Sequence, residues 1–460
     1  MLVGRRPAAF GGGLLLAVAA ILVVVAANRP IARPWTPPPS PTNFVIVVVD
    51  TLRYDATSMG GQPDTPFIDA VARSGVSFAR AYSTHDATPK SHFSLFTGLR
   101  DGLGSSNDRP DMSLAYQFRE RGYDTFGVAA NGSLSQTSMI CLKGFSRYAC
   151  PYDEWARMTP TQHLERLPPI LSRLRQYGAR ENAWNVARLY CSGPEVLARW
   201  RTMVASAREP FFGFVNIIEP HDPYLPSAEA LGPEPASADD VDADVRFRAL
   251  RFPLARPEAV PDAALRASIA RRIAASDGRA WSLSDDLRPS DLATYRRRYQ
   301  ASVRDADRLV QSLLRELEQR GLLERTWVVI VSDHGEAFGE GGFVTHWLSD
   351  LGDREATFHV PMVWAPPARA ARPAAGTTTV DDDVSLADVA PTIYDLAGID
   401  WTPLKARAPD GFGRSLVSYL MGGSVRPSSP VRVGGDLTDS DRQQMREDAL
   451  RRLRALGYIR

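Results

Sequence analysis

Two acidic residues and a histidine directly follow apolar, strand-like runs. Asp50 comes after residues 44–49 (FVIVVV), and Asp333 and His334 come after residues 327–332 (WVVIVS). In open α/β sheets, ligands bind outside the carboxyl ends of the strands, so we expect these side chains to share one rim of a sheet. Any one of them alone would more often be a strand-end cap. Two carboxylates and an imidazole together predict a site for a divalent cation, with Zn, Mn, Mg and Ca all compatible.

Histidines gather where such a rim would lie. Six of the seven follow predicted strands or precede predicted helices: His85, His92, His221, His334, His346 and His359. The seventh, His163, falls in an ordinary polar helix. His359 fits a buried structural role as well as a site role, and His85 is expected to neighbour the ligands rather than to be one.

The elements that must position these residues alternate between strands and helices. Apolar runs predict strands over residues 44–49, 76–82, 123–129, 211–218, 327–331 and 358–364. Helical periodicity covers residues 65–73, 292–320 and 385–397, and another helix is expected to begin at Ser91. This alternation predicts an α/β fold in which helices cover both faces of a mostly parallel sheet. Residues 227–289 show no clear periodicity and are either an insertion over the site or a partly ordered excursion.

The amino-terminal segment differs from the rest of the chain. Residues 8–27 carry no charge, and as a helix they would extend about 30 Å, the thickness of a bilayer's hydrocarbon core. Arg5 and Arg6 precede them and favour a cytoplasmic amino terminus, which places the remaining chain on the periplasmic or extracellular side. A retained single-pass anchor and a cleaved signal peptide both fit, and the anchor is favoured because residues 25–27 (VAA) match a cleavage site poorly. The proline-rich residues 29–42 predict a stiff spacer.

Composition excludes two protein classes. The chain has 54 basic and 53 acidic side chains, a net charge of +1, so nucleic acid is not an expected partner. Its three cysteines cannot build a disulfide scaffold and lack paired zinc-ligand spacing. In an exported domain Cys141 and Cys150 could form one disulfide, leaving Cys191 free.

Several motifs together resemble the sulfatase family of the alkaline phosphatase superfamily. The central one is residues 88–98 (TPKSHFSLFTG), which resembles the family's nucleophile signature. Similar segments occur in the family's order, over roughly residues 43–420. They are residues 47–55 (VVVDTLRYD), 216–226 (NIIEPHDPYLP), 331–340 (VSDHGEAFGE), 359–361 (HVP), 385–399 (SLADVAPTIYDLAGI) and 410–416 (DGFGRSL).

The resemblance implies roles for individual residues. Asp50, Asp333, His334 and the oxygen of Thr88 would bind one divalent metal ion. A second metal is not favoured, because residues 219–222 (EPHD) lack the Asp and His spacing of two-metal members. The other implied positions are His92 at the nucleophile and substrate oxyanion, His221 and His346 at the transferred or leaving group, and, more weakly supported, Lys90, Asn131 and Lys143.

Threonine at position 88 departs from the sulfatase pattern. Members of the sulfatase family, which this chain resembles, convert a cysteine or serine at this position to formylglycine. Threonine cannot be converted to the aldehyde that formylglycine carries. A threonine oxygen can instead attack phosphorus and form a covalent phosphothreonine. The similarity to phosphoethanolamine and phosphoglycerol transferases and to phosphodiesterases therefore predicts phosphoryl chemistry on a small-molecule, lipid or envelope phosphoester, ending in hydrolysis or transfer. A sulfuric ester hydrolase and a non-catalytic sulfatase-like binding protein are the alternatives.

These interpretations give one expected organisation of the chain. Residues 1–28 form the anchor or signal, residues 29–42 the linker, and residues 43–423 the catalytic domain with its insertion at 227–289. Residues 424–460 form a short tail with a charged amphipathic helix that closes the fold.

Overall fold

A computed structural model of the chain describes residues 42–100, 110–176, 183–232, 288–340, 344–346, 354–368, 378–408 and 411–421. The predicted anchor, nearly all of the linker and insertion, and the predicted tail helix lie outside these residues. Within them, no helix combines the length and the apolar character needed to cross a membrane.

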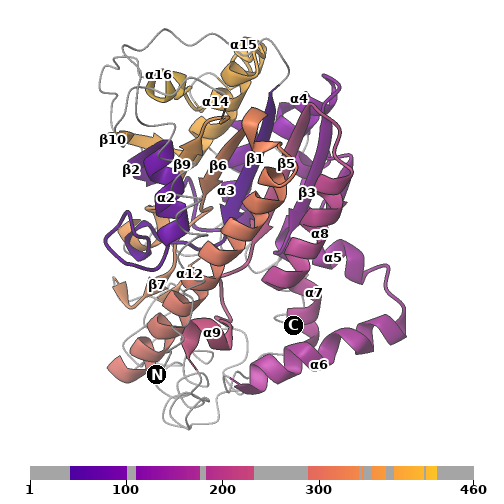
Figure 1. Ribbon diagram of the computed structural model, residues 1–460, viewed down its shortest axis with the longest axis vertical. Helices are drawn as coiled ribbons and strands as arrows, with labels where there is room; N and C mark the ends of the chain where they lie inside the picture. The colour runs from indigo at the N-terminus through magenta and orange to yellow at the C-terminus, as the bar shows by residue number, and fades with distance from the viewer. Residues whose placement is uncertain are drawn as a thin grey trace, which may run out of the picture.

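An eight-stranded sheet forms the centre of the described domain (Figure 1). All pairs of neighbouring strands are parallel except those of β9, which runs antiparallel to β2 and β6. The spatial order is β10 (Thr378–Ser385), β2 (Val76–Tyr82), β9 (Met362–Ala365), β6 (Thr326–Val331), β1 (Asn43–Val49), β5 (Phe211–Ile217), β3 (Asp124–Ala129) and β4 (Arg147–Ala149). The predicted α/β fold with a mostly parallel sheet is confirmed.

Helices cover both faces of this sheet, which explains why its central strands are continuously apolar. Alternate residues of β1 point to opposite faces, so Phe44, Ile46 and Val48 enter one core and Val45, Val47 and Val49 enter the other. The first core is closed by α3 (Thr88–Thr97), α4 (Leu114–Arg119) and α14 (Val389–Leu396). The second is closed by α2 (Pro66–Ser74), α8 (Gly193–Ala205) and α12 (Pro289–Glu318), the long helix that crosses the sheet in Figure 1.

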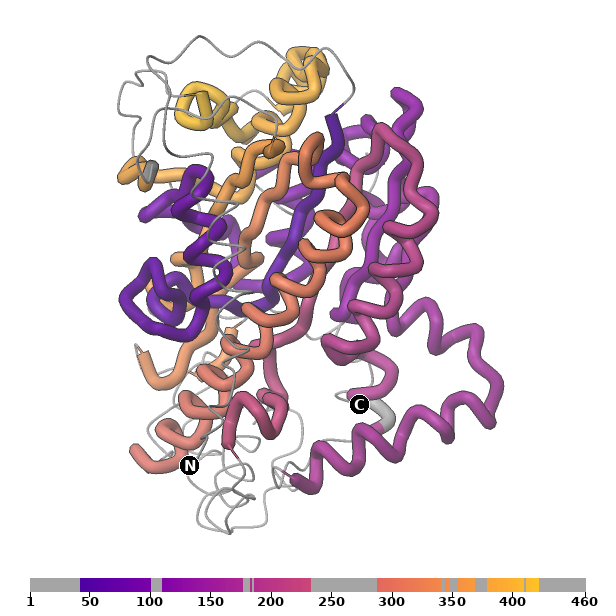
Figure 2. The backbone as a smooth tube through the Cα atoms, in the orientation of Figure 1, coloured from indigo at the N-terminus to yellow at the C-terminus, as the bar shows by residue number. Residues whose placement is uncertain are grey.

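Shorter elements complete the domain. A two-stranded antiparallel ribbon, β7 (Ala337–Phe338) with β8 (Val344–Thr345), lies outside the main sheet. In Figure 2, α6 (Pro160–Gln176) extends away from the body of the domain. The remaining helices are α5 (Pro151–Trp155), α7 (Ala183–Leu189), α9 (Ala228–Leu231), α13 (Arg354–Phe358), α15 (Thr402–Lys405) and α16 (Val417–Leu420). The 3-10 turns are η1 (Tyr54–Ala56), η3 (Pro110–Met112), η4 (Gly132–Leu134), η5 (Ile140–Leu142), η7 (Leu323–Arg325) and η9 (Leu386–Asp388).

Some predicted boundaries differ from the structure. α3 begins at Thr88 rather than Ser91, because Pro89 is tolerated in the first turn, where its missing N–H has no helical partner. The strand expected over 358–364 starts only at Met362, after α13 and the isolated bridge between Tyr82 and His359. The edge strand β10 was not predicted. All three cysteines are buried free thiols, so the disulfide considered between Cys141 and Cys150 is absent.

The carboxylate of Asp307 joins α12 to α2. Asp307 of α12 accepts hydrogen bonds from the backbone N–H groups of Phe67, at 3.0 Å, and Ile68, at 2.8 Å, in the first turn of α2. These donors lack partners within their own helix, so a side chain from α12 supplies the cap.

We expect Asp307→Ala to lower the free energy of unfolding by about 1–3 kcal/mol, because it leaves helix donors without an acceptor in a buried contact. Urea unfolding of the purified protein measures the change. The matched control is Glu318→Ala at the exposed end of the same helix, which should change stability by less than about 0.5 kcal/mol. Equal effects of the two substitutions would contradict this role for Asp307.

Candidate active site

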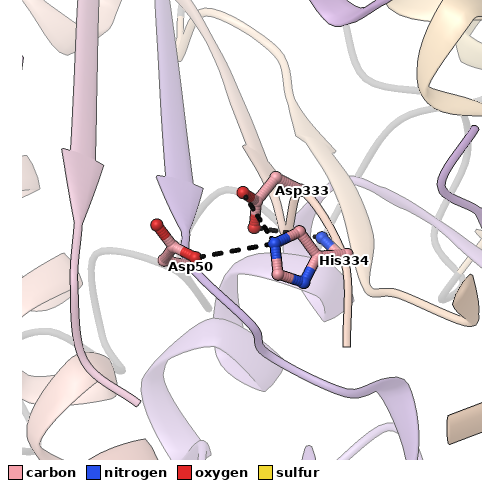
Figure 3. A group of neighbouring side chains, drawn as sticks. All are labelled: Asp50, Asp333 and His334. Carbon is pink, nitrogen blue, oxygen red and sulfur yellow. Dashed lines mark hydrogen bonds and ion pairs between the residues drawn. The ribbon is translucent and has the colours of Figure 1, made fainter. Parts of the chain in front are cut away.

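Two neighbouring strands place three metal-ligating side chains together. β1 and β6 pair in parallel, with Val48 opposite Val331, so the residues that follow them emerge at the same rim. The ligand atoms of Asp50, Asp333 and His334 all lie within 4.8 Å of one another. Figure 3 shows the two carboxylates and the imidazole turned toward one another. Among the described residues, this is the one group of three or more His, Cys, Asp or Glu side chains close enough to share an ion.

Thr88 lies against this trio. It is the first residue of α3, and its Oγ1 is 3.2 Å from Nε2 of His334. The side chain is buried, so its hydroxyl is held in a protected position rather than in bulk solvent. Because Thr88 opens the helix, the positive end of the α3 dipole lies at the same place and favours negative charge there.

A backbone carbonyl sets the tautomer of His334. Nδ1 lies 2.9 Å from the carbonyl oxygen of Gly335, which can only accept a hydrogen bond. Nδ1 therefore carries the proton, and Nε2 presents its lone pair. That lone pair is 3.5 Å from Asp333 Oδ2 and 3.9 Å from Asp50 Oδ1.

The electrostatics of the trio fit a bound cation. Burial, with the charge of Asp333 adding to it, raises the pKa of Asp50 to about 8, and burial raises the pKa of Asp333 to about 7. Asp50 Oδ1 and Asp333 Oδ2 are buried and accept no hydrogen bond from the described residues. Buried carboxylate oxygens without donors are costly unless a cation neutralises them. Two carboxylates, one imidazole and the Thr88 hydroxyl form a donor set that suits a divalent metal ion.

Two asparagines orient Asp50. Asn131 Nδ2 donates to Asp50 Oδ2 at 2.9 Å and lies 3.5 Å from Thr88 Oγ1. Asn216 Nδ2 lies 3.4 Å from the same Asp50 oxygen, while Asn216 Oδ1 accepts the N–H of Asn131 at 3.0 Å. The family resemblance indicated Asn131 only as a weaker candidate site residue and did not indicate Asn216. The polar residue within the otherwise apolar strand FFGFVNI was the available signal for Asn216.

His346 and His221 continue the site beyond His334. The ring of His346 lies 4.4 Å from that of His334, and the ring of His221 lies 4.9 Å from that of His346, measured between centroids. Nδ1 of His346 is 2.9 Å from Oε1 of the fully buried Glu336. Sequence reasoning missed Glu336, since one acidic residue in a Gly-Glu-rich run has no distinguishing pattern.

His92 contacts the backbone of Thr88. One helical turn after Thr88, its Nδ1 is 2.9 Å from the Thr88 carbonyl oxygen and 3.5 Å from Asp333 Oδ2. Burial lowers its pKa to about 3, so the ring is neutral. The structure thus places His92 where it supports the backbone of Thr88.

Other sequence candidates lie outside this cluster. His359 faces Glu355 through Nδ1 at 2.9 Å and the Ala79 carbonyl oxygen through Nε2 at 2.8 Å. It also stacks on Tyr54 with 4.3 Å between ring centroids, so it has a structural environment. Lys143 is exposed on the surface. The ligand cluster found among the described residues does not include His85 or Lys90, and the backbone oxygen of His85 accepts hydrogen bonds from the hydroxyls of Ser83 and Ser91.

Solved structures share this fold. Phosphonate monoester hydrolase of Agrobacterium radiobacter aligns with a TM-score of 0.53 at 21% identity, covering 84% of this chain and 78% of that one. The periplasmic domain of EptC from Escherichia coli, in complex with Zn, aligns with a TM-score of 0.51 at 15% identity, covering 90% of this chain and 95% of that one.

Sequence comparison identifies the family. Bovine arylsulfatase K is 23% identical over 387 residues, covering 78% of this chain and 63% of its own length. Choline-sulfatase of Rhizobium meliloti is 29% identical over 160 residues, covering 32% of this chain and 29% of its own length. A sequence model of the sulfatase family matches residues 42–399. The chain therefore belongs to the sulfatase family, and it spans 63% of the length of bovine arylsulfatase K.

Proposed function

We propose that this enzyme acts on phosphoesters or phosphodiesters through a covalent phosphothreonine at Thr88. The observation that carries the proposal is the position of Thr88 Oγ1, buried and 3.2 Å from the lone pair of His334. Relatives and structural neighbours carry names for both sulfate esters and phosphonate esters, so their similarity does not choose between them. The residue type at position 88 favours phosphorus, because threonine cannot become formylglycine.

The described residues suggest how the reaction would be divided among them. Asp50, Asp333 and His334 would hold a divalent cation, whose charge lowers the pKa of a nearby hydroxyl and offsets negative charge on phosphoryl oxygens. Thr88 Oγ1 would attack phosphorus while the ester oxygen leaves. Water or an acceptor alcohol would then attack the phosphothreonine and release Thr88.

The histidines beyond His334 would serve the leaving group. His346 lies next to His334, and its contact with Glu336 fixes the direction of its ring. Proton donation to a departing oxygen requires a group within hydrogen-bond reach of it, which His346 or His221 would provide. His92 would hold the first turn of α3 through the Thr88 carbonyl.

We also propose that residues 8–27 anchor the enzyme in a membrane with the catalytic domain outside the cytoplasm. The proposal rests on the uncharged apolar run and on the arginines that precede it. A lipid or envelope phosphoester, or a small soluble one, would then be the substrate.

Substitution of Thr88 should separate the chemistry from the fold. We expect Thr88→Ala to lower the turnover of an aryl phosphodiester by about 10³-fold or more, because no nucleophile remains. Thr88→Ser, the matched control, should keep measurable activity. Mass spectrometry should find the phosphoryl adduct on Thr88 of the wild-type chain. Full activity of Thr88→Ala, or faster turnover of the matching aryl sulfate than of the phosphodiester by the wild type, would contradict the proposal.

Metal binding should depend on pH in a defined direction. In the metal-free folded protein, the raised pKa values of Asp50 and Asp333 keep protons bound that the unfolded chain has already lost. The free energy of unfolding of the metal-free protein should therefore fall as pH rises through about 4 to about 8.

A cation replaces those protons, so the gain in Tm on adding Zn²⁺ or Mn²⁺ should increase between about pH 5.5 and about pH 8. Thermal unfolding measures this gain. Asp50→Asn is the control, and its gain should be smaller and depend less on pH. A gain that falls with pH, or that Asp50→Asn matches, would exclude this electrostatic account.

Fractionation tests the anchor. The full chain should stay in the membrane fraction after a high-pH carbonate wash, and a chain starting at residue 42 should be soluble. Recovery of the full chain in the soluble fraction with its amino terminus intact would rule out anchoring. Recovery of a chain shortened near residue 27 would instead identify a cleaved signal peptide.

A further inference from the structure

We propose that Tyr299, in the middle of α12, is a positioning residue for the metal ligand Asp333 and acts through the backbone of Thr51. The inference rests on the metal site of the proposed function. It concerns a hydroxyl that belongs to neither the candidate ligands nor the candidate nucleophile.

The Tyr299 hydroxyl joins α12 to the turn that follows β1. It donates a hydrogen bond to the carbonyl oxygen of Thr51 at 2.8 Å and accepts one from the N–H of Arg53 at 2.9 Å. Burial raises the pKa of this hydroxyl, so it stays protonated and able to donate. The Tyr299 hydroxyl thus holds the backbone at Thr51 and at Arg53. Thr51 directly follows the metal ligand Asp50.

Thr51 needs such a restraint. Its φ is +57°, in the left-handed region that a β-branched residue rarely adopts. The residue is fully buried, so water cannot satisfy its backbone groups. Backbone strain of this kind persists where the surrounding structure over-determines it, and it clusters at functional sites.

The left-handed turn has a direct effect on a ligand. It directs the N–H of Thr51 to Asp333 Oδ1 at 3.2 Å, and the N–H of His334 donates to the same oxygen at 3.0 Å. Two backbone donors therefore occupy Oδ1 and turn Oδ2 toward His334 Nε2, 3.5 Å away. Tyr299 controls the first of these donors, so it sets the orientation of Asp333 without touching it.

The ring of Tyr299 has a separate packing role. Its centroid lies 5.0 Å from that of Phe338 and 6.2 Å from that of Tyr224. Tyr299→Phe keeps this ring and removes only the hydroxyl. The matched control is Tyr394→Phe, which removes another buried tyrosine hydroxyl, the one bonded to the Met112 carbonyl oxygen at 3.1 Å.

The test measures metal affinity rather than turnover. Each full-length protein is stripped with a chelator, and its affinity for Zn²⁺ and for Mn²⁺ is measured by competition with a chromophoric chelator. We expect Tyr299→Phe to weaken binding by about 10- to 100-fold, as loss of a group that orients a ligand commonly does. Tyr394→Phe should bind as the wild type does, even though both variants lose some thermal stability.

A second substitution distinguishes positioning from a general loss of stability. Glycine adopts φ near +57° without strain, so Thr51→Gly in the Tyr299→Phe background should recover at least about half of the lost affinity on a logarithmic scale. No recovery, or unchanged affinity in Tyr299→Phe, would overturn the inference while leaving the proposed function in place. A wild-type chain that binds neither ion would overturn both.

Discussion

Two carboxylates buried beside each other impose the main physical constraint on this domain. Asp50 and Asp333 end adjacent parallel strands, and the pairing of those strands holds the two acids close together whether or not they repel. Burial raises the pKa of both carboxyl groups, and the charge of Asp333 raises that of Asp50 further. A divalent cation bound between the two acids would offset this cost, because both carboxylates would then share its positive charge. The Asp50 carboxylate is oriented by Asn131 and Asn216. The Asp333 carboxylate is oriented by the backbone N–H groups of Thr51 and His334.

The backbone around the candidate site contains turns with unusual dihedral angles. Within the described residues, three non-glycine residues have positive φ, and each lies next to part of the site. Thr51 follows Asp50, Thr345 precedes His346, and Tyr224 lies three residues after His221. Strained turns at these places let consecutive residues face in directions that a regular strand or helix does not allow. The rigid part of the domain, the sheet with its two helical layers, holds these turns in place.

The sequence predicted the features that depend on short-range pattern. Parallel apolar strands imply a common rim at their carboxyl ends, so the pattern alone predicts that Asp50, Asp333 and His334 lie together. The start of α3 was misplaced because Pro89 is compatible with both a loop and a first helical turn. β10 was missed because its sequence, TTVDDDVS, has the polarity of a loop and only its place at the sheet edge makes that acceptable.

Residues that act through distant partners were harder to predict. Tyr299 lies in an amphipathic helix where tyrosine is an ordinary core residue, and its partners are more than 240 positions away. Glu336 gains significance only from the ring of His346, which the β7–β8 ribbon brings back toward it. Pairings of this kind follow from tertiary structure, which periodicity within one segment does not encode.

The direction of β1 also fixes how the domain faces its surroundings. The chain enters this strand at Asn43, and Asp50 follows its last residue, so the rim with the candidate site and the point of entry lie at opposite ends of a seven-residue strand, about 23 Å apart. Asn43 therefore lies at the end of the sheet away from Thr88. Under the proposed function, substrates would approach Thr88 from the end of the sheet opposite to Asn43.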